Sequence, residues 1–133
     1  LGKQRVEAYQ VLNVLLGRTE TKGWRNHPIT KMWDGYENAL KQYLNECIDE
    51  WVSRGYNNNM KHEVIDGDIK YPSWLGNDLF HSSHRANLLR KDEEFYSKFM
   101  WNEDSSNPYA WFDTEKKEWY LQHVGTGIRE YVL

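Results

Sequence analysis

The first apolar residues of the chain recur at helical spacing. Within residues 3–16 they stand three or four positions apart, at Val6, Tyr9, Leu12, Leu15 and Leu16. Gly17 follows directly, and a glycine is a usual residue just beyond the end of a helix. The pattern predicts a short amphipathic helix over residues 3–16.

A longer apolar pattern of the same kind lies within residues 28–54. Intervals of three and four separate Trp33, Tyr36, Leu40, Tyr43, Leu44, Cys47, Ile48, Trp51 and Val52. Pro28 suits the first helical turn, where a missing N–H leaves nothing unpaired, and Gly55 stands in the helix-stop position. This pattern predicts one helix over residues 28–54 and places Cys47 in the apolar core.

The second half of the chain alternates turn signals with apolar segments. Residues 56–75 are rich in Asn, Asp and Gly and predict a long loop, a feature that is often functional or mobile. Asn77 or Asp78 is a suitable N-cap for a helix reaching Leu89, and Asp92 is suitable for a further turn or two. Two aromatic segments around residues 109–112 and 119–121 flank a polar turn and predict a hairpin.

These elements together predict a mainly α fold. We expect a compact single-domain helical bundle over residues 1–133, with a small C-terminal β-hairpin. A chain of 133 residues is long enough to bury one core without disulfides. The sequence contains one cysteine, which excludes an internal disulfide framework and a cysteine-rich zinc site and favours an intracellular, cytoplasmic protein.

Several classes of protein are excluded by what the chain lacks. No apolar run approaches the roughly 20 residues that span a bilayer, and the start of the chain has no signal-peptide pattern. The sequence contains no glycine-rich phosphate loop, serine-nucleophile elbow or cysteine-protease signature. We therefore expect a soluble protein, and no motif calls for a cofactor.

Charge is distributed unevenly along the chain. The formal net charge is −3, yet residues 1–33 carry six Lys or Arg side chains against two glutamates, a net charge of +4. A second basic segment lies within residues 81–91. Two basic segments on an acidic chain indicate either a localised anion site or ordinary scatter of charge. Seven Trp and nine Tyr leave a similar choice between core packing and stacking on nucleobases.

Residues 81–91 allow three interpretations. His81 and His84 share a helical face, but a tetrahedral zinc site needs further ligands, so no metal site is expected. Alternatively, one histidine is a hydrogen-bonded core residue and the other is exposed. We favour phosphate binding, because a guanidinium fork, a second charge and amide or imidazole donors suit an anion. The residues assigned to it are His81, His84, Arg85, Asn87 and Lys91.

A second candidate site precedes Pro28. An aromatic plane, a guanidinium, an amide and an imidazole follow one another in Trp24, Arg25, Asn26 and His27. They stand at a predicted helix N-terminus, where free N–H groups and the helix dipole favour anions. The alternatives are this anion site and a simple turn with an N-cap.

The first predicted helix carries a carboxylate among cations. Lys3, Glu7 and Gln10 lie along one polar face, and Arg5 is rotated away from them by about 160°. Glu7 is then either half of a solvated ion pair or a catalytic group. From the residues alone the solvated pair is favoured.

Several motifs together carry a family resemblance. Residues 1–8 (LGKQRVEA), 23–28 (GWRNHP) and 54–56 (RGY) resemble, in that order, motifs of pyrimidine-dimer DNA glycosylases of the endonuclease V type. With residues 72–76 (PSWLG) and 81–91 (HSSHRANLLRK) added, the chain is similar to an uncharacterised bacterial and phage family related to those glycosylases. This resemblance covers about residues 1–111 and leaves residues 111–133 outside it.

The resemblance implies a helical DNA-repair enzyme that binds duplex DNA and flips a nucleotide out of the stack. In such glycosylases an N-terminal amine attacks the anomeric carbon of the sugar, forms a Schiff base and permits strand cleavage as an AP lyase. A first-helix glutamate assists, so Glu7 is the implied acid/base and Arg5 the implied DNA contact, with Lys3 beside them. We expect the amine on a segment preceding Leu1, because the resembled proteins begin upstream of this helix.

Three hypotheses follow. The first is a glycosylase-related protein that acts on DNA through a cleft formed by the first helix, residues 24–27 and residues 81–91. The second is a non-catalytic nucleic-acid-binding module with the same cleft. The third is a structural subunit of a larger assembly, which the aromatic content permits.

Overall fold

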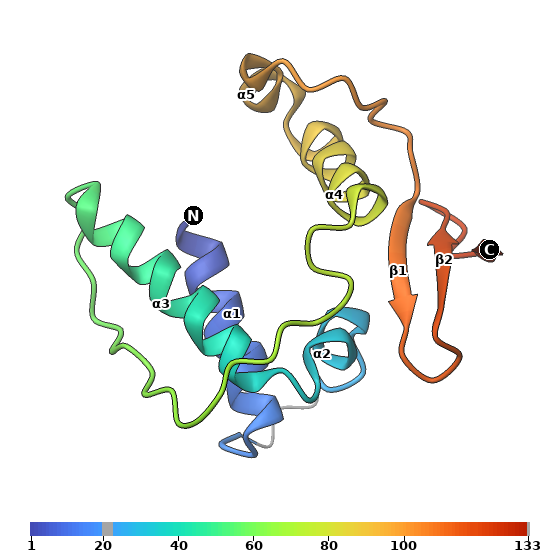
Figure 1. The fold of residues 1–133 in the computed structure, drawn as a ribbon. Helices are drawn as coiled ribbons and strands as arrows, with labels where there is room; N and C mark the ends of the chain where they lie inside the picture. The colour runs from blue at the N-terminus through green and yellow to red at the C-terminus, as the bar shows by residue number, and fades with distance from the viewer. Residues whose placement is uncertain (20–22, 133) are drawn as a thin grey trace. The chain divides into compact units, whose positions relative to one another are not determined.

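A computed structural model describes residues 1–19 and 23–132, in two compact units. Unit 1 comprises Leu1–Ser73 and unit 2 comprises Trp74–Leu133. The predicted fold class, mainly α with a small β element near the C-terminus, is confirmed (Figure 1). A single domain over residues 1–133 stays a prediction, and each unit is described by itself below.

Unit 1 consists of α1 (Gly2–Leu15), α2 (Pro28–Trp33) and α3 (Glu37–Ser53). Helix α1 packs along α3 and also contacts α2. The fully buried side chains of this unit come from all three helices and are Leu12, Met32, Leu40, Leu44 and Ile48. Burial of this apolar surface is what holds α1 against α3.

The predicted first helix is confirmed, but only part of its predicted apolar face is buried, Leu12 being the fully buried member. Val6, Tyr9 and Leu16 are exposed, whereas Ala8, Val11 and Leu12 are buried. The last three positions follow the i, i+3, i+4 spacing of a helix face. The small Ala8 side chain therefore lies on the packed side of α1, and the polar face of the helix remains open.

The prediction of one continuous helix over residues 28–54 is wrong. The structure has two helices, because the chain leaves the helical path after Trp33 and Gly35 adopts φ +88°. That backbone conformation favours glycine. The Glu37 carboxylate accepts a hydrogen bond from the Gly35 N–H at 3.1 Å and so fastens the turn to the start of α3. Gly55 ends α3 as predicted, with φ +83°.

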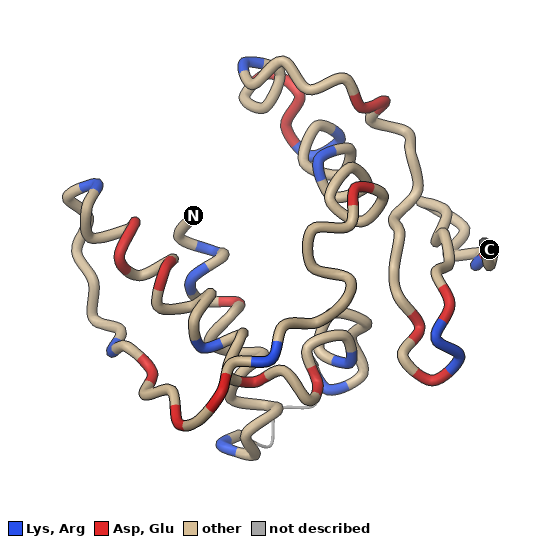
Figure 2. The backbone as a smooth tube through the Cα atoms, viewed as in Figure 1, with Lys and Arg blue, Asp and Glu red and all other residues tan. Residues whose placement is uncertain are grey.

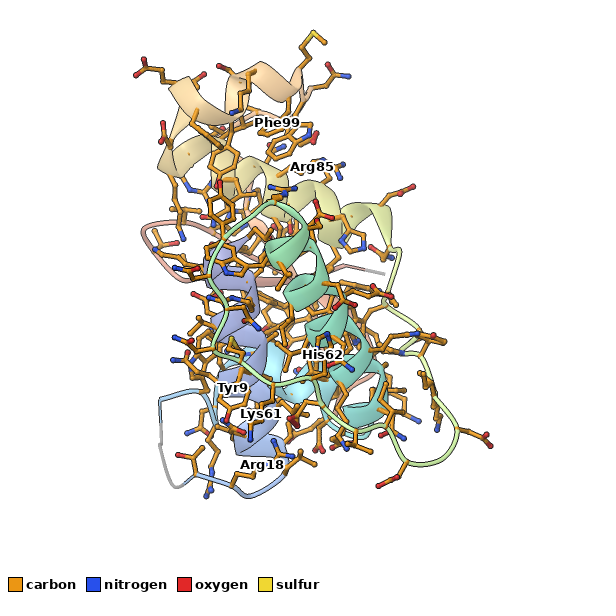
Figure 3. The ribbon with its side chains drawn as sticks, turned by 90° about the vertical axis from the view of Figure 1, so that its left-hand side faces the viewer. Tyr9, Arg18, Lys61, His62, Arg85 and Phe99 are labelled. Carbon is orange, nitrogen blue, oxygen red and sulfur yellow. The ribbon has the colours of Figure 1, made fainter. Side chains whose placement is uncertain are left out.

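The predicted loop is fastened along α3. The Asn45 side chain bonds both the N–H (2.7 Å) and the carbonyl (3.0 Å) of Glu63. Asn38 donates to the carbonyls of Asp66 and Asp68, at 2.8 and 3.2 Å. At the end of α1, Arg18, which Figure 3 labels, forms an ion pair with Glu63 at 2.7 Å. These side-chain hydrogen bonds pair backbone groups of the loop that no helix or strand pairs.

Unit 2 consists of α4 (Asp78–Lys91), α5 (Glu93–Tyr96), the 3₁₀ turn η1 (Ser97–Phe99) and a sheet. Asn77 and Asp92 cap α4 and α5, as predicted, by accepting from the N–H groups of Phe80 and Phe95. The predicted hairpin is confirmed as β1 (Tyr109–Asp113) and β2 (Glu118–Gln122). A third strand that the sequence did not predict, β3 (Arg129–Val132), pairs antiparallel with β2.

Helix α4 packs against β1, and aromatic rings fill the space between them. The buried apolar side chains of the unit are Trp74, Phe80, Ala86, Leu89, Ala110, Trp111 and Tyr120. Across the described helices of both units, none is long and apolar enough to cross a membrane.

Candidate nucleic-acid interface

The exposed face of α1 is joined to neighbouring segments by hydrogen bonds. Lys3, Glu7 and Gln10 are all exposed, in agreement with the predicted polar face. The Trp24 indole N–H donates to the Gln10 side-chain oxygen at 3.0 Å, which ties the 24–27 turn to α1. Gln4, one turn before Glu7, donates to the Tyr43 hydroxyl of α3 at 3.4 Å.

The 24–27 turn is a helix cap with an aromatic face. His27 is the N-cap of α2, and its Nδ1 accepts the Ile29 N–H at 3.1 Å, with Pro28 at the first helical position. The Trp24 and His27 rings lie 5.0 Å apart. Both of these side chains are half-buried, while Arg25 and Asn26 are exposed. The N-cap that the sequence allowed here is confirmed, and the cationic and amide groups of the turn face solvent.

His27 lies within the electrostatic influence of Glu7. Burial lowers the pKa of His27, and the negative charge of Glu7 opposes that shift by stabilising the imidazolium. In the neutral ring, an Nδ1 that accepts a hydrogen bond leaves the proton on Nε2. The charge of the α1 carboxylate therefore acts on the imidazole of the turn, although twenty positions separate Glu7 and His27 along the chain.

Tyr43 is a member of this site that the sequence did not indicate. Burial, together with the neighbouring Cys47 thiol, raises the pKa of Tyr43 to about 12. The phenol is thus a hydrogen-bond donor across the physiological range. Cys47 is buried in the core, as predicted, and burial raises the pKa of its thiol. We call Gln4, Glu7, Gln10, Trp24, His27 and Tyr43 the N-terminal polar cluster.

Arg5 is packed apart from this cluster. Its guanidinium lies 4.4 Å from the centre of the Trp51 ring and donates to the Asn58 side-chain oxygen at 2.5 Å. Trp51 in turn donates to the Asn57 carbonyl at 2.6 Å. Arg5 therefore connects α1, α3 and the start of the loop. The DNA contact that the resemblance implies for Arg5 stays a prediction.

We expect Arg5→Ala to destabilise unit 1. Loss of the contact with Trp51 and of the charged hydrogen bond to Asn58 should lower the free energy of unfolding by about 1–2 kcal/mol. Urea unfolding followed by circular dichroism measures this effect. Arg5→Lys is the matched control, since it keeps the charge but not the planar fork. An Arg5→Ala protein of unchanged stability but weakened DNA binding would favour the implied DNA contact instead.

The two histidines of α4 serve the packing of unit 2. His81 Nε2 accepts a hydrogen bond from the Gly76 N–H at 3.0 Å and so holds the turn before the helix. The His84 ring lies 4.5 Å from Phe80 and 5.1 Å from Trp111, within the aromatic cluster between α4 and β1. Among the described residues, no group of three or more His, Cys, Asp or Glu side chains is arranged to hold a metal ion.

The basic side chains of α4 bond the segment that leads to β1. Arg85 forms an ion pair with Glu103. Arg90 donates to the carbonyls of Ser105 (2.5 Å) and Asn107 (3.1 Å), and to the Asn87 side-chain oxygen (3.0 Å). Lys91 is exposed at the end of the helix. Phosphate binding by this face stays a prediction, and any anion would meet guanidinium groups that already have partners.

The predicted cleft draws on both units. The first helix and the 24–27 turn lie in unit 1, whereas residues 81–91 lie in unit 2. Within unit 1, Lys and Arg residues lie at the start of α1, and several Asp and Glu residues lie along α3 (Figure 2). Of the segments assigned to the predicted cleft, the structure joins the first helix to the 24–27 turn, through the hydrogen bond between Trp24 and Gln10.

A comparison with protein families bears on the same unit. Residues 1–64 match the family model described as pyrimidine dimer DNA glycosylase. This segment of the chain is thus similar to that glycosylase family. No curated protein and no solved structure gave a significant match. The matched residues include α1, the 24–27 turn and α3, so the glycosylase-related segment contains every member of the N-terminal polar cluster.

Proposed function

We propose that this protein binds duplex DNA at the N-terminal polar cluster and excises a damaged or modified base after flipping its nucleotide. The observation that supports the proposal most directly is the coincidence of the glycosylase match with the cluster. Base flipping requires a pocket wall on which an extruded base can stack. The half-buried indole of Trp24, held by Gln10, offers such a surface.

Glu7 is the proposed acid/base. In amine-dependent excision, a primary amine bonds to the anomeric carbon, and the base departs with the bonding electron pair and takes up a proton. The sugar ring then opens to a Schiff base, which requires further proton transfers. A carboxylate whose charge acts on an imidazole, as that of Glu7 acts on His27, is suited to moving these protons. The proposal holds for any primary amine that reaches the anomeric carbon.

Exposed cations of unit 1 are the proposed phosphate contacts. Lys3 lies on the same face of α1 as Glu7, and Arg25 lies in the turn that ends at His27. Asn26 adds an exposed amide. Phosphate contacts of this kind fix the position of the duplex and supply salt-sensitive affinity. We extend the proposal to His81, His84, Arg85, Asn87 and Lys91 as a second phosphate-binding face.

Trapping with borohydride tests the catalytic part of the proposal. Duplexes that contain a pyrimidine dimer, an abasic site or a modified base are offered to the protein with its natural N-terminus. A covalent protein–DNA adduct after reduction, together with strand cleavage, is the expected result. Neither adduct nor cleavage on any of these duplexes would remove the lyase activity. Salt-sensitive binding without turnover would then identify a non-catalytic nucleic-acid-binding module.

Arg25→Ala tests the binding part. We expect weaker duplex affinity and a salt dependence reduced by about one unit in the slope of log K against log salt. Fluorescence anisotropy at several salt concentrations measures both quantities. Arg54→Ala is the matched control, because Arg54 is an exposed arginine of unit 1 that pairs with Glu50 at the end of α3. Equal losses in the two variants would contradict a specific contact at Arg25.

A further inference from the structure

Aromatic side chains of α5 and η1 form an exposed patch on unit 2. Phe95 and Phe99 are 48% and 50% exposed, and Met100 is 85% exposed. The Trp101 ring stacks on Tyr96 (5.8 Å between centres, 14° between planes) and on Phe99 (5.3 Å, 20°). Figure 3 labels Phe99 in this segment. We call Phe95, Tyr96, Phe99, Met100 and Trp101 the aromatic patch.

The aromatic patch exposes more adjoining apolar side chains to solvent than is usual for a protein surface. Single exposed apolar side chains are common on proteins, but a contiguous apolar patch generally marks an interaction site. The rings of the patch pack on one another across adjacent turns. Met100, between Phe99 and Trp101, adopts φ +56°, a conformation rare for side-chain-bearing residues. The local fold thus presents these side chains in spite of an unfavourable backbone angle.

The patch already accepts a cation. The Lys98 ammonium lies 3.7 Å from the centre of the Phe95 ring and 5.3 Å from that of Phe99. A ring face attracts an ammonium or guanidinium group through its quadrupole. The contact with Lys98 therefore shows that these rings can bind a cationic side chain.

Acidic side chains surround the rings. Residues 92–104 contain five Asp or Glu residues and one lysine. Asp92, Glu93, Glu94 and Asp104 are exposed, and Glu103 pairs with Arg85. Such a surface repels phosphate groups, which argues against nucleic acid as the occupant in spite of the stacked rings. It attracts basic side chains.

We propose that the aromatic patch docks a basic, partly apolar segment of a partner protein. An Arg or Lys side chain of that segment lies on the Phe95 and Phe99 rings and displaces Lys98. The exposed carboxylates pair with its other cations, and its apolar side chains cover Met100. This site is separate from the N-terminal polar cluster, so it does not depend on the proposed function.

A set of designed peptides tests the docking site. The probe is a fluorescein-labelled peptide of alternating Arg and Leu residues, with one matched peptide carrying Glu for Arg and another carrying Ser for Leu. We expect the Arg–Leu peptide to bind more tightly than about 1 mM and both matched peptides to bind at least tenfold more weakly. Fluorescence anisotropy gives the three affinities.

Variants of the protein locate the binding. Phe99→Ala should weaken the Arg–Leu peptide about tenfold, whereas Ile128→Ala should leave it unchanged. Ile128 is the matched control, because it is an apolar residue of unit 2 that is 61% exposed. Lys98→Ala should strengthen binding about two- to fivefold, since the competing ammonium is gone. Circular dichroism confirms that each variant is folded.

Four outcomes would overturn the proposal. These are no binding of the Arg–Leu peptide, equal binding of the Glu–Leu peptide, an affinity that Phe99→Ala leaves unchanged, and binding that Lys98→Ala weakens. Sedimentation of the protein alone at several concentrations addresses a different occupant. A dimer that Phe99→Ala dissociates would show that a second copy of the chain covers the patch, and would replace the proposed partner.

Discussion

Replacing Glu7 with Gln is expected to reduce base excision about 100-fold or more while duplex binding stays within about twofold. The substitution keeps the size and hydrogen-bonding capacity of the side chain but removes its ability to take up and release a proton at neutral pH. Single-turnover excision and borohydride trapping measure the loss. Anisotropy with the same duplex measures the affinity.

Two controls make this result specific. Glu46→Gln removes another exposed carboxylate of unit 1, on α3, and should leave excision unchanged. His27→Gln tests the imidazole on which the Glu7 charge acts and is expected to lower excision to a smaller extent, because it removes a second group that can transfer protons. Full excision activity in Glu7→Gln would remove Glu7 from the mechanism, whatever the affinity for DNA. Weak binding with normal excision at saturating DNA would assign it to binding.

Local signals in the sequence predicted the helix ends. Each of these signals acts on backbone groups within a few positions, so it can be recognised without the tertiary fold. The residues are His27 with Pro28, Gly55, Asn77 and Asp92. The break at Gly35 was missed for a related reason. Trp33, Tyr36 and Leu40 keep the spacing of a helix across the glycine, and apolar periodicity does not show whether the backbone continues.

Strand β3 was missed because its pairing is not local. Arg129–Val132 is four residues long and has no alternating apolar pattern of its own. It becomes a strand by bonding to β2. Short segments of this type depend on a partner that the sequence does not identify.

The candidate site also has features that the sequence predicted and features that only the structure revealed. The polar face of α1 followed from helical spacing, and the resemblance named the family that the match over residues 1–64 supports. The hydrogen bond between Trp24 and Gln10 and the influence of the Glu7 charge on His27 required tertiary structure. So did the different surroundings of Arg5 and Glu7, which two helical steps rotate by about 200°. The glycosylases that the chain resembles have an arginine directly followed by glutamate, whereas Val6 intervenes here, and the structure shows Arg5 over Trp51.

The basic side chains of α4 show what a charge pattern leaves out. Arg85 and Arg90 stand in a segment without acidic residues, which made them look available to an anion. Their partners, Glu103 and the carbonyls of Ser105 and Asn107, come from a later part of the chain. Net charge counted along the sequence therefore does not show which cations already have partners within the fold.

Replacing Leu44 with Ala is expected to have the largest effect on stability in unit 1. Leu44 is fully buried in α3, in the core that holds α1. Deletion of its buried methyl groups should lower the free energy of unfolding by about 2–5 kcal/mol, through lost burial and the cavity left behind. Urea unfolding followed by far-UV circular dichroism measures the change. Val52→Ala, at a position of the same helix that is 52% exposed, should cost less than about 0.5 kcal/mol.

The same substitution tests how the candidate site is held. The N-terminal polar cluster is assembled from separate elements. Gln4, Glu7 and Gln10 come from α1, whereas Tyr43 comes from α3, so the cluster depends on the packing of these two helices. A loosened α1–α3 contact should therefore weaken duplex binding and excision in Leu44→Ala even at temperatures where the protein remains folded. Leu44→Met, which conserves volume, should restore both stability and activity to near the original values. A Leu44→Ala protein as stable as the Val52→Ala control would show that this contact does not hold the unit together.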